Sequence, residues 1–296
     1  MDLNWLDDVL VLLEEGNLTR AAERRNITQP AFSRRIRCFE DWLGQPILER
    51  SPNRVAVSTA LVSSETEIRA LVARLRDLRT NIAGFESNRT VVTIAAQHAP
   101  LCSSFPDMAL RAKSHFPNLR MRLRAGNLGD CMSMFLRGDA DMFLCYEPEG
   151  ASQLEFGDSI VRGRWGDDYL VPVVGGGLRY LVSADGSIPE NTPAIVYPEE
   201  SYFGQVLKRS SRPFGTPSSS EDPICVTAFS SGTLELVLKG IGVGWLPYSM
   251  IHAQILSGAL ISLANVFGKE DLNVSLFASK KSEAAQQLLR FWTDQH

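Results

Sequence analysis

The chain has 296 residues, of which 44% are apolar and 22% charged, and a net charge of −4. This composition is typical of a globular protein, and no apolar run approaches the ~20 residues that a membrane span needs, which excludes the membrane-spanning class. The length exceeds one simple core, so we expect two or three compact units, and five cysteines without a C-x-x-C pair favour a reducing, cytoplasmic compartment over a disulfide framework.

The first 25 residues predict two helices. Apolar residues recur at helical spacing within residues 3–15, and Gly16 ends that helix. A shorter helix over residues 19–25 is followed by a tight turn at Asn26. The opening segment, MDLNWLDD, is acidic and lacks the positive leading region of a secretory signal.

Positive charge is concentrated next to this turn. Residues 19–40, TRAAERRNITQPAFSRRIRCFE, hold six arginines and two glutamates, whereas the first 58 residues together hold eight arginines and nine acidic residues. A basic patch inside a nearly neutral domain favours a surface that docks in one orientation over a nonspecific polyanion binder.

A third helix is expected over residues 29–42, with Thr28 as its N-cap and Pro30 in its first turn. Its apolar stripe consists of Phe32, Ile36, Phe39 and Leu43. Two short helices joined by a short turn, the second with a core side and a polar side, are the pattern of a helix-turn-helix. The alternative is a charged amphipathic helix on an ordinary helical domain.

In a helix-turn-helix, the N-terminal residues of the second helix reach base edges in the major groove. Gln29 can pair with adenine, and Arg34 or Arg37 can pair with guanine. Thr28 or Ser33 can donate to phosphate. The segment therefore predicts direct contact with double-stranded DNA.

A wing and a linker helix are predicted next. ILERSPNRVAVS indicates two short strands, with Arg54 available to the DNA backbone. Residues 59–85 contain no proline and no glycine before Gly84, which predicts one long helix. Its apolar residues recur at spacings of 3, 4, 3 and 4, as in a heptad seam: Ile68, Leu71, Leu75, Leu78 and Ile82. Such a seam is buried against its twin in a dimer or against the chain's own N-terminal domain. Residues 84–88 are expected to form a hinge.

The rest of the chain alternates strands with helices, which predicts a parallel sheet. First-lobe strands are expected over residues 91–96, 119–124 and 141–146. The chain then crosses near residues 162–166 into a second lobe, with strands over 169–174, 180–182 and 194–196 and helices over 203–209 and 233–239. Residues 267–278 return to the first lobe, which a helix over 283–294 closes.

Ligands of two-lobed folds bind in the cleft, at strand C-termini and helix N-termini. Five residues fit this description: Gln97 and His98 in the loop after the first strand, Ser201 and Tyr202 before a second-lobe helix, and Thr227 before the crossing helix. Unpaired N–H groups at helix starts favour an anion, typically a carboxylate. His98 is equally well explained as an ordinary loop histidine.

Cysteine chemistry competes with a metabolite ligand. Cys131 is near a helix start, where the helix dipole lowers a thiol pKa, and Cys145 and Cys225 are at strand ends, so all three are candidate redox residues. The alternative is that they are small buried hydrophobes. The four histidines lack metal-ligand spacing, and neither a nucleophile elbow nor a dinucleotide fingerprint occurs. We therefore expect no catalytic residue, no metal and no cofactor.

The segment AAERRNITQPAFSRRIRCFEDWLGQPILER resembles the signature of LysR-type transcriptional regulators, from its alanine pair through T-Q-P-A-x-S and I-x-x-F-E to the closing E-R. Two later segments resemble the effector domain of that family, Gly126-x9-Leu136-x-Gly138-Asp139-Ala140-Asp141 and Val237-x-x-Gly240-Ile241-Gly242-Val243-Gly244-x-Leu246-Pro247. The resemblance covers nearly the whole chain. In detail, ITQPAFSRRIR resembles an alphaproteobacterial branch that includes regulators named LsrB and VtlR. The departures, at Asn17, Leu48 and Leu61, are at packing or capping positions.

The resemblance implies an α+β multidomain fold. Residues 1–58 would form a winged helix-turn-helix, 59–88 a dimerisation linker and hinge, and 89–296 a two-lobed α/β effector domain that resembles periplasmic binding proteins. Lobe I would cover about 89–162 and 267–296, and lobe II about 163–266. It also implies that Thr28, Gln29, Pro30, Ser33, Arg34 and Arg37 face DNA.

We therefore expect a bacterial, cytoplasmic transcriptional regulator and no enzyme. Its expected partners are an inverted repeat in double-stranded DNA, further copies of itself in a dimer or tetramer, RNA polymerase at promoters, and an unidentified small effector for which the helix starts favour an anion; no membrane partner is expected. A ligand or a thiol oxidation would change lobe closure and so promoter bending. The alternative is a ligand- or redox-sensing protein that acts through a protein partner without sequence-specific DNA binding.

Overall fold

The computed structural model describes residues 3–51, 54–83, 90–148, 154–189, 191–219 and 223–294. The chain forms two compact units, Met1–Ser87 and Asn88–His296, and each has its own hydrophobic core. Within the described ranges, no helix is both long enough and apolar enough to cross a membrane.

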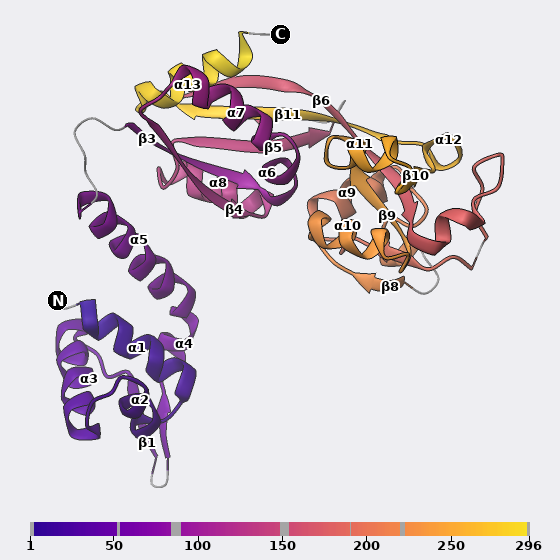
Figure 1. The fold of residues 1–296 in the computed structure, drawn as a ribbon. Helices are drawn as coiled ribbons and strands as arrows, with labels where there is room; N and C mark the ends of the chain where they lie inside the picture. The colour runs from indigo at the N-terminus through magenta and orange to yellow at the C-terminus, as the bar shows by residue number, and fades with distance from the viewer. Residues whose placement is uncertain are drawn as a thin grey trace. The chain divides into compact units, whose positions relative to one another are not determined.

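The N-terminal unit begins with three helices, α1 (Leu3–Glu15), α2 (Leu18–Arg24) and α3 (Gln29–Leu43) (Figure 1). Their apolar faces share one core, which contains Leu6, Val9, Phe32, Ile36 and Phe39. The prediction that Leu43 joins this core is wrong, because its side chain is 45% exposed. Helix α3 ends at this residue, and Gly44 turns the chain away in a left-handed conformation.

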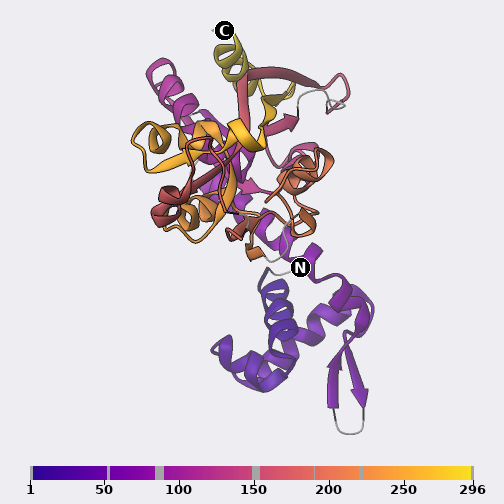
Figure 2. The same ribbon diagram turned by 90° about the vertical axis from the view of Figure 1, so that its right-hand side faces the viewer.

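Two short antiparallel strands, β1 (Leu48–Ser51) and β2 (Arg54–Val57), follow the helices as the wing pattern predicts. Figure 2 shows them as two purple strands that extend from the helical part of the unit. The Glu40 carboxylate on α3 accepts hydrogen bonds from the N–H groups of Ile47 and Leu48, at 2.9 and 3.2 Å. This carboxylate fixes the base of the wing to α3.

The linker is two helices rather than one, because α4 (Thr59–Ser63) ends at Ser64 and α5 (Glu65–Ala83) begins directly after it. The predicted seam is divided between two faces of α5. Ile68 and Leu75 pack against the N-terminal core beside Val72, a buried residue that the heptad count omits. Three seam residues are instead exposed: Leu71 at 45%, Leu78 at 53% and Ile82 at 69%. The predicted hinge, residues 84–88, lies outside the described residues.

The C-terminal unit contains a nine-stranded sheet in the order β4-β3-β5-β11-β6-β9-β7-β8, with β10 paired to β6 (Figure 1). Its strands are β3 (Thr90–Gln97), β4 (Leu119–Gly126), β5 (Met142–Pro148), β6 (Ile160–Gly175), β7 (Ala194–Val196), β8 (Pro223–Val226), β9 (Val243–Pro247), β10 (Leu260–Ser262) and β11 (Glu270–Ser279).

This sheet is mixed, so the prediction of a parallel sheet is wrong as a whole. Strands β3, β4 and β5 are parallel, and so are β7, β8 and β9. Strands β6 and β11 are antiparallel to each other, β11 is antiparallel to β5, and β6 is antiparallel to β9. Because β6 carries the chain into the second lobe and β11 carries it back, the two crossing strands must run in opposite directions.

Helices cover both faces of the first lobe: α6 (His98–Ser103), α7 (Phe105–His115) and α13 (Glu283–Thr293) pack on one face, and α8 (Leu128–Leu136) packs on the other. In the second lobe, α10 (Ser230–Leu238) and α11 (Tyr248–Leu256) share a core with β6, β7 and β9. Helix α9 (Tyr202–Arg209) packs into the large core that extends from the first lobe. The short elements include α12 (Ala264–Phe267) and the 3₁₀ helix η2 (Pro217–Ser219).

The strand predicted over residues 180–182 is wrong, because Gly176–Leu181 form a 3₁₀ helix, η1. Gly176 has a φ of +54°, and a Cβ at this position would lie 2.5 Å from the Gly240 nitrogen. Glycine therefore permits a close turn here that an alternating strand pattern does not anticipate.

Candidate nucleic-acid interface and ligand cleft

The six arginines of the basic run divide into paired and unpaired residues. Four form ion pairs with acidic residues of α1: Arg20 with Glu15, Arg24 with Glu14 and Glu15, and both Arg25 and Arg35 with Asp8. Arg34 and Arg37 are exposed on α3 and have no ion pair or hydrogen bond within the part of the chain that the structure describes. The surface of α3 therefore presents two arginines to a partner, and the acidic residues of α1 neutralise the others.

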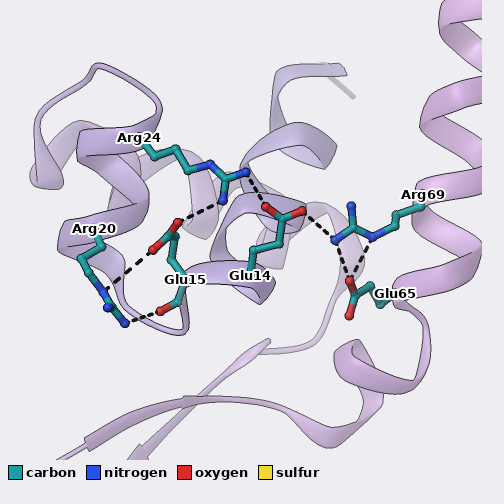
Figure 3. A network of polar contacts seen from close by, with 6 residues as sticks. All are labelled: Glu14, Glu15, Arg20, Arg24, Glu65 and Arg69. Carbon is teal, nitrogen blue, oxygen red and sulfur yellow. Dashed lines mark hydrogen bonds and ion pairs between the residues drawn. The ribbon is translucent and has the colours of Figure 1, made fainter.

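Figure 3 shows that this neutralisation extends to the linker. Glu14 on α1 accepts from Arg24 of α2 at 2.6 Å and from Arg69 of α5 at 2.7 Å. Arg69 also pairs with Glu65 one turn earlier on α5, at 2.7 Å. One exposed network thus connects α2, α1 and α5.

A second ion pair extends the contact between α1 and α5. Arg76 donates to Asp7 at 2.6 Å. Asp7 and Glu14 are seven residues apart on α1, and their partners Arg76 and Arg69 are seven residues apart on α5, in the opposite order. The two helices are therefore antiparallel, with Val72 buried between the two ion pairs.

Most of the DNA-facing residues expected from the sequence are at the exposed N-terminal end of α3. Thr28, Gln29 and Pro30 are exposed, and Ser33 is half-buried. The Gln29 amide donates to the Ser33 hydroxyl at 3.0 Å, and the Thr28 side chain accepts no capping hydrogen bond although Thr28 is the N-cap residue. Arg54 begins β2, and its side chain lies outside the described part of the structure.

A cleft of about 340 Å³ lies between the two lobes of the C-terminal unit. Four of the five predicted ligand residues line it: Gln97, His98, Ser201 and Tyr202. Gln97 and His98 are not in a loop, because β3 ends at Gln97 and α6 begins at His98. The remaining lining residues are Ala99, Gly126, Asn127, Leu128, Gly129, Tyr146, Tyr197, Pro198, Glu200, Phe203, Gln205, Ala228 and Ser230.

The cleft lining includes polar groups that can donate hydrogen bonds. Gln97 is 6% exposed, and its side-chain oxygen accepts from the Tyr146 N–H at 2.7 Å, so its amide nitrogen remains available to a ligand. The Tyr202 hydroxyl is buried without a partner among the described residues, and burial raises its pKa, so it stays a neutral donor. Helices α8 and α10 begin here without a side-chain cap, which leaves N–H groups unsatisfied. Among the residues that the structure describes, the lining contains one carboxylate, Glu200, and no lysine or arginine.

Thr227 does not line the cleft. Its N–H donates to the Val196 carbonyl at 3.0 Å, and its hydroxyl accepts from the Phe229 N–H at 3.2 Å, so it shapes the turn before α10. Helix α10 begins three residues earlier than expected, and Ser230 takes the cleft position instead. The N-cap of α10 is Phe229, which is not a common capping residue, so the local sequence did not indicate this earlier start.

A buried carboxylate connects the lobes beneath the cleft. Asp168 on β6 is 3% exposed and accepts from the Tyr146 hydroxyl at 2.6 Å, from the Tyr169 N–H at 2.8 Å and from the Ser249 N–H at 3.1 Å. The Ser249 hydroxyl donates to it as well, and the Ser103 hydroxyl lies 2.8 Å from that of Tyr146. Residues of α6, β5, β6 and α11 thus share one network, which sequence spacing did not indicate.

The cysteines differ from the sequence expectation. Cys131 is buried in α8, and burial together with the Asp130 charge raises its pKa to about 11, opposite to the direction that a helix start favours. Burial also raises the pKa of Cys145 on β5. Cys225 on β8 is half-buried, and Cys102 on α6 is exposed. Among the described residues, no three His, Cys, Asp or Glu side chains are grouped as metal ligands.

Comparison with known proteins gives two family matches. Residues 3–60 match the bacterial regulatory helix-turn-helix protein model of the lysR family, and residues 86–295 match the LysR substrate binding domain. The HTH-type transcriptional regulator YjiE of Escherichia coli is 27% identical over 267 residues, which are 89% of this chain and 84% of YjiE.

Two full-length solved structures share the fold. Vibrio fischeri DarR in complex with DNA has a TM-score of 0.61 at 21% identity, with 100% of this chain and 99% of that chain covered. HypT of Salmonella typhimurium, described as a hypochlorite-specific LysR-type transcriptional regulator, has a TM-score of 0.58 at 23% identity, with 98% and 97% covered.

Proposed function

Because the chain belongs to the lysR family of bacterial regulatory helix-turn-helix proteins, and so is a transcriptional regulator rather than an enzyme, we propose which of its residues read DNA and sense the effector. The DNA-reading residues are on α3. The observation that carries this proposal is the division of the arginines, because Arg34 and Arg37 are exposed without a partner among the described residues while their neighbours are neutralised by α1.

Each residue of this surface has a proposed role. Arg34 or Arg37 donates to a guanine edge, and Gln29 pairs with adenine once it leaves Ser33. Thr28 and Ser33 donate to phosphate, Pro30 packs beside the backbone, and Arg54 of the wing contacts the neighbouring phosphates. DarR, which shares the fold, was solved in complex with DNA, and this supports the placement by analogy.

The exposed stripe of α5, which consists of Leu71, Leu78 and Ile82, is the proposed dimer contact. Exposed apolar residues at this spacing are buried most simply against a second copy. Two copies of α3 related by a twofold axis would read an inverted repeat, and a tetramer would bridge two such sites. The domain limits proposed for this arrangement are 1–58, 59–88 and 89–296.

The cleft is the proposed effector site, and the proposed effector is a small anion such as a carboxylate. The Gln97 amide and the uncapped starts of α8 and α10 supply donors for an acceptor-rich ligand, and Tyr202 lines the same cleft. The His98 ring carries an N–H donor and lies 4.9 Å from the ring of Phe229, edge to face. Ligand binding would change lobe closure, and so the relation of the DNA-bound copies to RNA polymerase in the cytoplasm.

A thiol signal is the second candidate, and HypT, which is described as hypochlorite-specific, supports an oxidant as the signal by analogy alone. Cys131 and Cys145 are buried with raised pKa values, which favours an anionic effector over thiol oxidation as the signal.

We further propose that the chain belongs to the LsrB- and VtlR-like branch, because of the segment ITQPAFSRRIR. A tree of full-length family sequences tests that placement.

A selection of tight binders from random duplex DNA tests the DNA-reading proposal. It is run at physiological salt with reductant and repeated with oxidant. We expect an enriched inverted repeat whose footprint is the same in both conditions. A footprint that changes with oxidant would favour cysteine oxidation over a metabolite as the signal. If no sequence is enriched in either condition, a sensor that acts through a protein partner would be favoured.

A further inference from the structure

Asp8 is a fully buried carboxylate on α1 that joins the two helices of the DNA-reading motif. Its side chain is 0% exposed. The Arg25 Nε donates to Oδ1 at 2.6 Å, and the Arg35 Nε lies 2.6 Å from Oδ2. Arg25 is the C-cap of α2 and Arg35 is on α3, so one carboxylate holds residues on both sides of the turn.

The same contacts direct two positive charges inward. The side chains of Arg25 and Arg35 are 26% and 30% exposed, compared with 66% for Arg20 and 51% for Arg24, which pair with surface glutamates. One guanidinium nitrogen of Arg35 is buried without a hydrogen bond among the described residues. Burial raises the pKa of Asp8 above its ordinary value, and the two arginines offset only part of that rise.

Nonspecific affinity for DNA comes from contacts of Lys and Arg with phosphate, each of which releases counterions. Arginines next to the recognition helix would add such contacts on any sequence and so reduce the ratio of specific to nonspecific binding. A buried acid that pairs with them removes this sequence-independent affinity and leaves the base-reading residues unchanged.

We infer that Asp8 is a specificity-determining residue that withholds Arg25 and Arg35 from DNA phosphates while it positions α3 against α2. The inference rests on the proposed assignment of α3 as the DNA-reading helix. Asp8 itself does not touch DNA, because it is buried. Its effect is exerted through the two arginines.

The salt dependence of DNA binding tests this inference in the full-length protein. Binding of Asp8→Asn and wild type to a 30-bp duplex of mixed sequence is measured between 50 and 300 mM salt. A B-DNA phosphate contact contributes about 0.9 to the slope of log K against log salt, so the slope should steepen by about one to two for each protomer bound. On the duplex enriched by selection, the ratio of specific to nonspecific affinity should fall by about tenfold. An unchanged or shallower slope would overturn the inference.

Controls separate this effect from charge and stability. Glu23→Gln makes the same charge change on an exposed residue of α2 and should leave the slope within error. Thermal unfolding confirms that each variant is folded at the assay temperature, because simple destabilisation weakens binding without adding phosphate contacts.

If Asp8→Asn does not fold, a second variant, Arg25→Gln, tests the inference. Arg25→Gln in the wild-type background should leave the slope unchanged, whereas Arg37→Gln should lower it by about 0.9 if Arg37 contacts phosphate. A slope lowered by Arg25→Gln would show that Arg25 already binds DNA and would overturn the inference. If the wild-type protein binds no duplex at all, the assignment of α3 as the DNA-reading helix fails. If the wild-type protein binds and Asp8→Asn shows the same slope, only the inference about Asp8 fails.

Discussion

At the scale of single residues, the arginines of α2 and α3 differ in what they can contact. Arg34 has no partner within the described residues, whereas Arg24 is paired with Glu14 and Glu15 at 2.6 and 3.0 Å. Arg34→Ala should weaken binding to the selected duplex by about 1–3 kcal/mol and relax preference at one base pair. Arg24→Ala is the matched control and should change affinity much less. Fluorescence anisotropy on single-base variants of the duplex measures both, and uniform weakening on every duplex would make Arg34 a phosphate contact.

The cysteines should differ in reactivity. A thiol with a pKa of about 11 is ionised in about one molecule in a thousand at pH 8, and Cys131 is also buried. We expect an aromatic disulfide reagent at pH 8 to modify exposed Cys102 first and to spare Cys131 and Cys145 while the protein is folded. Cys102→Ser should remove the fast phase. Modification of Cys131 before unfolding, detected by peptide mass spectrometry, would contradict this expectation.

At the scale of elements, α5 has one face for its own domain and one for a partner. Val72 is buried against the N-terminal core, and Leu78 on another face is 53% exposed. Leu78→Asp would place a charge in the proposed dimer contact and should raise the dimer dissociation constant at least about tenfold. Val62→Asp on α4, where the side chain is 51% exposed, is the control and should leave the dimer dissociation constant unchanged. Sedimentation equilibrium measures the dissociation constants of both variants. An unchanged dissociation constant for Leu78→Asp would mean that the dimer contact does not include Leu78.

The contact between α1 and α5 should weaken in acid. Arg69 lowers the pKa of Glu14 below its ordinary value, so Glu14 binds a proton less readily in the folded state than in the unfolded state. Its stabilising contribution is therefore present above its unfolded pKa and is lost as pH falls through the lower folded pKa. Between pH 5 and 3, hydrogen exchange of the α1 and α5 peptides should show that the wild-type protein loses more protection than Glu14→Gln does. Because salt screens exposed charges, 1 M salt should reduce this difference. Equal protection across that range would mean that the pair contributes nothing.

At the scale of the whole molecule, the two lobes of the C-terminal unit depend on the network around Asp168. Tyr146→Phe removes one of its buried donors and should destabilise that unit by about 1–3 kcal/mol. Tyr180→Phe, at 76% exposure, should change the free energy of unfolding by less than about 0.5 kcal/mol. Urea unfolding followed by fluorescence compares them. Equal stability of the two variants would show that other contacts hold the lobes together.

Local patterns predicted the helix-turn-helix, the wing and most strands and helices, because caps, turns and apolar periodicity act within a few residues. Long-range pairing was not predictable in the same way. Alternation of strands and helices favoured a parallel sheet, and the two strands that carry the chain between the lobes, β6 and β11, make it mixed. The heptad count could not show that Val72 packs on α1, since the periodicity of one helix does not identify its neighbour. Gln97 and Ser201, which line the cleft, were predicted from a strand end and a helix start, whereas Asp168 lies in the middle of a strand without a local signal.

The antiparallel pairing of α1 with α5 has a practical consequence for chimeric biosensors. A fusion that cuts the chain after the wing, at residue 58, would remove Arg76 from Asp7 and Arg69 from Glu14, leave Glu14 with Arg24 alone, and uncover the surface under Val72. The smallest transplantable cassette therefore ends beyond Arg76, with part of the linker inside it. Hybrids joined on that side of α5 should keep the native orientation of their DNA-reading helix, whatever sensing module replaces the rest.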